Sequence, residues 1–223
     1  MRARWHGDGV DETPEIGFSQ EFWDERYRTA DQLFSGQPNS QLVAQVAGLR
    51  PGLALDAGAG EGADAVWLAR QGWAVTAVDV SGVALQRAAG LAAAAGERIA
   101  ARIRWQRADL RSWIPERERF DLVTALFMYL PPDEQAVLHQ RLADAVCPGG
   151  MLLVVGHHRD DWHANVGRHG PVEMLWTAED LAESLAPEKW EIVLATSIPR
   201  PATDLDGHPA HVQDTVLRAR RRG

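Results

Sequence analysis

The sequence predicts an α/β protein with a doubly wound, mostly parallel seven-stranded sheet and an antiparallel hairpin at one edge. Two observations predict this class. From residue 53 onward, short apolar segments alternate with helical stretches, which is typical of a parallel sheet covered by helices on both faces. Near the carboxyl end, two apolar segments flank a run rich in Pro and Gly, which is typical of an antiparallel pair.

The elements are expected in the following order. Ser19 can cap a first short helix, and a second helix is expected after Pro38-Asn39. Seven apolar segments are expected as strands, at 53–57, 74–78, 103–105, 122–127, 151–155, 190–196 and 211–218. Helices are expected between them, at 63–70, 83–95, 134–146 and near 178–185. The run 198–209 is expected to separate the last two strands.

Length and composition limit the possible classes of protein. The 223 residues suit one domain, which we expect at 19–223, with its first helices within 19–50 and a flexible polar arm at 1–18. The 23 basic and 31 acidic residues give a net charge of −8, which disfavours nucleic acid as a partner.

No membrane partner is expected either, because no apolar stretch approaches the roughly 18 residues of a membrane span. The first residues lack the apolar segment of a secretory signal, and the single Cys147 has no internal disulfide partner. We therefore expect a soluble, cytoplasmic protein.

A glycine-rich segment, LDAGAGEG at residues 55–62, stands where the first strand gives way to a helix. Gly58 and Gly60 allow a tight turn and close approach of the backbone to a ligand at the helix N-terminus. With Ala63 they also fit the G-x-G-x-x-G/A fingerprint of dinucleotide sites. The segment alone therefore leaves a nicotinamide cofactor open.

Acidic residues stand at the ends of the first three strands: Asp56, Asp79 and Asp109. Ligands of open α/β sheets bind at this edge. Asp56 suits an ammonium or sulfonium cation, Asp79 has the position from which an acid accepts hydrogen bonds from ribose hydroxyls, and Asp109 could accept one from an amino group such as that of adenine. The three acids together predict a cationic ligand that carries an adenosine.

These motifs resemble those of class I S-adenosylmethionine-dependent methyltransferases. The matching segments are LDAGAGEG (55–62), VD (78–79), ADL (108–110), FDLV (120–123) and CPGGML (147–152). The resemblance implies the Rossmann-like methyltransferase fold and S-adenosylmethionine as cofactor. It implies cofactor contacts from Gly58, Ala59 and Gly60, from Asp79 and Val80 near the ribose, from Asp109 and Leu110 at the adenine, and from Leu126 beside the sulfur.

A segment around Trp23 and Tyr27 is similar to the tellurite-resistance and thiopurine methyltransferase branch. These two aromatic residues are either core residues or a lid over the cofactor.

The acceptor side is expected beyond the fourth and fifth strands. Candidate walls of an apolar pocket are aromatic: Phe127, Tyr129, Trp162 and Trp176. A polar segment after the fifth strand supplies candidates for a general base: His157, His158, Asp160 and His163. The spacing of these residues fits no known metal motif, so no metal site is predicted.

The sequence thus predicts methyl transfer from S-adenosylmethionine to a small molecule by in-line displacement. A thiolate or a similar ionised acceptor needs no general base. Two alternatives stay open: an NAD(P)-dependent oxidoreductase, disfavoured by Asp56 beside a pyrophosphate, and a catalytically silent methyltransferase-like binding module.

Overall fold

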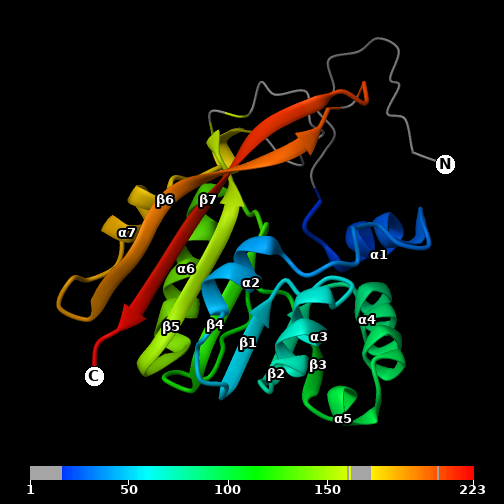
Figure 1. The fold of residues 1–223 in the computed structure, drawn as a ribbon, viewed down its shortest axis with the longest axis horizontal. Helices are drawn as coiled ribbons and strands as arrows, with labels where there is room; N and C mark the ends of the chain where they lie inside the picture. Colours follow the sequence, from blue (N-terminus) through cyan, green and yellow to red (C-terminus); the bar gives the residue numbers. More distant parts are fainter. Residues whose placement is uncertain (1–16, 160, 162–171, 205) are drawn as a thin grey trace.

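The computed structural model describes residues 17–159, 161, 172–204 and 206–223. Its seven strands form one sheet in the order β3-β2-β1-β4-β5-β7-β6 (Figure 1). The strands span Leu53–Ala57 (β1), Ala74–Asp79 (β2), Ile103–Arg107 (β3), Phe120–Leu126 (β4), Val146–His157 (β5), Trp190–Thr203 (β6) and Pro209–Arg221 (β7). β1 to β5 run parallel, and β7 pairs antiparallel with both β5 and β6. The predicted fold class is confirmed.

Helices cover both faces of the sheet (Figure 1). They span Gln20–Arg28 (α1), Ser40–Val46 (α2), Ala63–Arg70 (α3), Gly82–Ala94 (α4), Glu97–Ala100 (α5), Pro132–Ala145 (α6) and Ala178–Glu183 (α7), with a 3-10 turn η2 at Val172–Met174. The predicted cap of α1 is present, because Ser19 Oγ accepts a hydrogen bond from the backbone N of Phe22. The second helix begins after Asn39 as predicted, and Asn39 Oδ1 caps it by accepting from the backbone N of Gln41. No described helix is long and apolar enough to cross a membrane.

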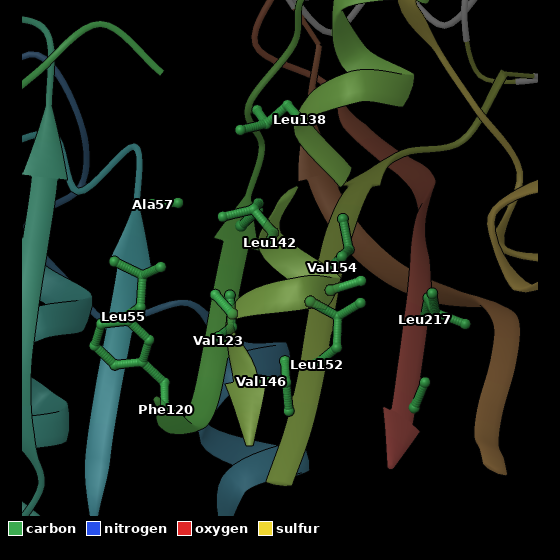
Figure 2. Close-up of a cluster of buried hydrophobic side chains, with 14 of the residues drawn as sticks. Leu55, Ala57, Phe120, Val123, Leu138, Leu142, Val146, Leu152, Val154 and Leu217 are labelled. Atoms are coloured by element: carbon green, nitrogen blue, oxygen red, sulfur yellow. The ribbon is translucent and has the colours of Figure 1, made fainter. Parts of the chain in front are cut away.

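Alternating residues of the central strands enter two separate apolar clusters, because successive side chains of a strand point to opposite faces. Leu152 and Val154 pack with α6 and α7 on one face, and Figure 2 shows Leu138 and Leu142 of α6 above these strands. Leu153 and Val155 pack with α2 and α3 on the other face. Because β1, β2 and β4 run parallel, their carboxyl ends lie at the same end of the sheet, and the two clusters hold them there.

The carboxyl-terminal hairpin is longer than predicted. We expected the run 198–209 to separate the two strands, but β6 continues to Thr203 and β7 begins at Pro209. Pro199 and Pro201 are tolerated because β6 is the outermost strand, where a missing N–H on the open side breaks no ladder bond. The hairpin therefore extends well past the end of β5, whose last residue, His157, pairs with Asp214 (Figure 1).

Candidate functional site

The glycine loop between β1 and α3 has the backbone conformation that the motif predicts. Gly58 and Gly60 have φ angles of 78° and 52°, in the left-handed region that side chains disfavour. A Cβ on Gly58 would stand 3.2 Å from Sδ of Met128, and one on Gly60 would stand 3.0 Å from the Tyr27 hydroxyl. Met128 and Tyr27 thus lie directly against the two glycines.

Asp79 at the end of β2 fixes this loop. Its Oδ2 accepts a hydrogen bond from the Gly60 backbone N at 2.8 Å, and its Oδ1 accepts one from Ser81 N at 2.8 Å. The carboxyl group is 8% exposed, and burial raises its pKa. Each carboxylate oxygen can accept a second hydrogen bond, so the group suits a ligand that offers two hydroxyls.

Asp56 at the end of β1 is buried almost completely, with 2% of its surface exposed. Thr124 Oγ1 donates a hydrogen bond to its Oδ1 at 3.1 Å, and Oδ2 has no partner among the described residues. Burial, together with the negative charge of Asp64, raises the pKa of Asp56 to about 8 against the hydrogen bond from Thr124. An unsatisfied buried carboxyl oxygen is costly, and a bound cationic group would relieve that cost.

A cleft of about 320 Å³ opens between the start of α1 and the ends of β2 and β3. Val80 and Asp109, both predicted to contact the cofactor, line it together with residues 19–21. The carboxylate of Asp109 is already engaged by Arg111, whose Nη2 donates to Oδ2 at 2.6 Å. The hydrogen bonds that Arg111 donates from its side chain and its backbone lower the pKa of Asp109. An adenine amino group at this rim would share the carboxylate with Arg111.

The other predicted cofactor residues lie around the loop. Tyr27 is buried and its ring centroid is 6.0 Å from that of Trp23, which is partly exposed. Ala59 and Leu126 are partly exposed and pack against the cluster on the α2 and α3 side. Leu110 is buried in the cluster on the α6 and α7 side. The structure thus places Tyr27 against the glycines and Leu110 in the core.

Two acidic residues that sequence analysis did not single out, Glu61 and Asp24, connect α1 and the segment after it to the glycine loop and to the start of α4. Glu61 accepts hydrogen bonds from Leu33 N at 3.0 Å and from Arg87 Nη1 at 2.9 Å. Asp24 of α1 accepts from Ser81 Oγ at 2.6 Å and from Val83 N at 3.1 Å. No local pattern in the sequence marks either residue, because Ser81 and Leu33 are far from them along the chain.

Replacing Asp24 with Ala is expected to lower the free energy of unfolding by about 1–3 kcal/mol, because the hydroxyl and amide at the start of α4 lose their acceptor. Urea unfolding followed by circular dichroism measures this change. Asp24→Asn retains an acceptor oxygen and is expected to lose less. Glu25→Ala changes an exposed neighbour on the same helix and is the control; an equal loss in Glu25→Ala and Asp24→Ala would contradict the role of Asp24.

Aromatic side chains gather beyond β4 and β5. The ring of His157 lies 4.6 Å from that of Phe127 and 5.7 Å from that of Tyr129, centroid to centroid. Its backbone N donates to the Tyr129 hydroxyl at 2.7 Å. Phe127 has a φ angle of 52°, which is uncommon for a bulky residue and typical of functional sites. We call Phe127, Tyr129 and His157 the aromatic cluster.

Two further residues that were predicted on the acceptor side, His158 and Trp176, lie near the end of β5. The backbone N of His158 donates to Gln213 O at 3.1 Å. Trp176 packs against Gly156 and, at 5.6 Å between ring centroids, against His139 of α6. It packs against the cluster on the α6 and α7 side, whereas Phe127 packs against the cluster on the other face. Asp160, Trp162 and His163 lie outside the described residues.

Comparison with known proteins gives a family for this site. Residues 54–150 match a family described as a methyltransferase domain, and this range includes the glycine loop, Asp79 and Asp109. The 2-heptyl-1-hydroxyquinolin-4(1H)-one methyltransferase of Mycobacteroides abscessus is 26% identical over an alignment of 159 residues, and the match covers 66% of this chain and 69% of that protein.

Two solved structures share the fold. One, from work on the conversion of a disulfide bond into a thioacetal group during echinomycin biosynthesis, has a TM-score of 0.72 and 24% identity, and the match covers 91% of each chain. TehB from Haemophilus influenzae has a TM-score of 0.66 and 18% identity, covering 92% of this chain and 67% of that one. At these identities the likeness concerns the fold, and the tellurite-resistance branch stays a prediction. The match over residues 54–150 favours S-adenosylmethionine over the nicotinamide cofactor that the glycine fingerprint left open, and it identifies a methyltransferase domain in this chain.

Proposed function

We propose that this methyltransferase acts on a small molecule, which it binds against the aromatic cluster and methylates by in-line displacement. The observation that carries the proposal is the closeness of Met128 to Gly58, because Met128 stands in the chain between Phe127 and Tyr129 of the aromatic cluster. It supports an acceptor site beside the glycine loop, for which we propose cofactor binding. Two further facts support a small acceptor. The net charge of −8 disfavours nucleic acid, and the curated relative is named for a quinolone substrate.

The chain offers a fitting site for S-adenosylmethionine, which supplies, when bound, a methyl group on a positively charged sulfur. We propose that Asp79 accepts hydrogen bonds from the ribose and that the backbone at Gly58 and Gly60 lies along the methionine part. Asp56 would provide a negative charge for the cationic part. The cleft at Val80 and Asp109 would take the adenine.

On the acceptor side the residues position the reactant and exclude water. Phe127 and Tyr129 give aromatic walls, and such walls favour a dry, aligned complex in which little further catalysis is needed. We propose His157 as the proton acceptor for an acceptor group that is protonated at working pH, because its ring lies within the aromatic cluster. An acceptor that is already ionised needs no such step.

The test is transfer of a labelled methyl group from S-adenosylmethionine, preceded by calorimetric titration with S-adenosylmethionine, S-adenosylhomocysteine and NADH. We expect micromolar binding of both adenosyl ligands and none of NADH. Labelled product is expected with small planar acceptors, including 2-heptyl-1-hydroxyquinolin-4(1H)-one, and absent with tRNA or duplex DNA. Binding without transfer to any acceptor of a broad panel would favour the silent binding module instead.

A matched pair of variants tests the acceptor side. Phe127→Leu removes the ring but keeps an apolar side chain, and we expect it to raise the KM for the acceptor with little change in the affinity for S-adenosylhomocysteine. Val137→Leu, at an exposed position of α6, is expected to change neither.

A further inference from the structure

A pair of oppositely charged side chains lies beside the aromatic cluster, where β7 leaves β5 and the β6–β7 hairpin goes on alone. Figure 1 shows this extension of the hairpin past the end of β5. Asp214 of β7 pairs in the sheet with His157, the last residue of β5. Its side chain is only 1% exposed, and it accepts a hydrogen bond from Arg200 Nε at 2.7 Å. A buried carboxylate needs a partner of this kind, so the pair fixes the position of Arg200.

The guanidinium of Arg200 is oriented from two sides. Asp214 engages its Nε, and its Cζ lies 6.0 Å from the centroid of the Phe127 ring. The Arg200 side chain is about one third exposed, at 32%. Within the described part of the chain, the Nη atoms of Arg200 make no hydrogen bond. An arginine has five N–H donors, so the four on these two nitrogens can bind a ligand.

Arg200 also lies on the acceptor side of the cofactor loop. Phe127, beneath the guanidinium, directly precedes Met128, and Met128 lies against Gly58. The ring of His157 also lies close to the Phe127 ring, 4.6 Å away between centroids. A planar molecule held against Phe127 would therefore have the Nη edge of Arg200 within reach.

We infer that Arg200 binds an ionised oxygen group, such as a carboxylate, of a planar acceptor, and that it makes the enzyme prefer anionic acceptors over neutral ones. The inference rests on the proposed function, since it assigns the acceptor class of that site. Its chemical basis is the planar guanidinium fork, which matches a carboxylate with two parallel hydrogen bonds. Because Asp214 and Phe127 already orient the guanidinium, the Arg200 side chain loses little further conformational freedom when the ligand binds.

The experiment uses the full chain saturated with S-adenosylhomocysteine and compares two probes of equal shape. These are 4-hydroxyquinoline-2-carboxylate and its neutral carboxamide, titrated by calorimetry. We expect the carboxylate to bind at least about tenfold tighter, because charged hydrogen bonds are roughly twice as strong as neutral ones. In Arg200→Gln the preference is expected to fall below about twofold, with an unchanged affinity for S-adenosylhomocysteine.

Arg200→Gln leaves Asp214 buried without a cation, so the double variant R200Q/D214N, in which two amides replace the ion pair, provides a second measurement. Arg98→Gln, on α5 at the far side of the molecule, is the matched control and is expected to keep the preference. The inference is wrong if the wild-type chain does not prefer the carboxylate, or if the preference survives in R200Q and in the double variant. Failure of the wild-type chain to bind S-adenosylhomocysteine would instead overturn the proposed cofactor site.

Discussion

Asp79→Ala is expected to weaken binding of S-adenosylhomocysteine by about 100-fold or more. The carboxylate has two tasks at once. It accepts hydrogen bonds from Gly60 N and Ser81 N, which hold the glycine loop, and we propose that it also accepts the hydroxyls of the ribose. Hydrogen bonds to charged groups are each worth about 1.5–3 kcal/mol, so the loss of two of them to the ligand accounts for an effect of this size. Calorimetric titration measures it.

Two further variants make this prediction specific. Gly60→Ala places a Cβ 3.0 Å from the Tyr27 hydroxyl at a left-handed φ angle, so it should weaken binding through the loop while Asp79 stays intact. Asp180→Ala, on the exposed side of α7, removes an acid far from the loop and should bind normally. Near-normal affinity in Asp79→Ala, in a protein whose circular dichroism matches the wild type, would refute the role given to Asp79.

Much of the fold could be predicted from sequence because the strands of a buried parallel sheet are short, continuous apolar runs. The helix at 63–70 was predicted with the bounds that α3 has, since the glycine motif marks its start. The hairpin was predicted too short, because Pro199 and Pro201 read as loop residues unless the strand is known to be at an edge. The four-residue α5 was not predicted, since so short a helix has no visible period.

Some residues of the site could be predicted from sequence, and others could not. Asp56, Asp79 and the glycines could be recognised because their place at strand ends follows from the chain itself. Asp24, Glu61 and Arg200 could not, since their partners Ser81, Leu33 and Asp214 are between 14 and 57 residues away. The side of the sheet on which Trp176 packs depends on the path of the chain after β5, which no local pattern fixes.

The stability of the chain is expected to depend on pH through Asp56, whose pKa of about 8 in the folded protein lies far above the ordinary value of 3.8. Between these two values the folded chain binds one more proton than the unfolded chain. The free energy of unfolding therefore falls as the pH rises from about 4 to about 8, and this contribution levels off above pH 8. Asp64, whose pKa burial raises to about 6, adds to the slope in the lower part of the window.

Asp56→Asn removes the ionisation and should flatten this dependence. The variant should gain stability relative to the wild type as the pH rises, by on the order of a few kcal/mol between pH 5 and pH 9. Urea unfolding at four pH values gives the two curves, and Asp64→Asn, measured in parallel, separates the contribution of Asp64. Parallel curves for Asp56→Asn and the wild type would contradict the raised pKa of Asp56.

The same group is expected to link cofactor binding to a proton. At pH 7 the buried Asp56 is mostly protonated, whereas a bound cation favours the carboxylate. S-adenosylmethionine should therefore release a fraction of a proton on binding, and its affinity should rise between pH 6 and pH 8. Calorimetry in buffers of different ionisation enthalpy counts the proton. Asp56→Asn should bind more weakly, with no rise over this range, so the residue that destabilises the empty protein at high pH would be the one that the cationic cofactor requires.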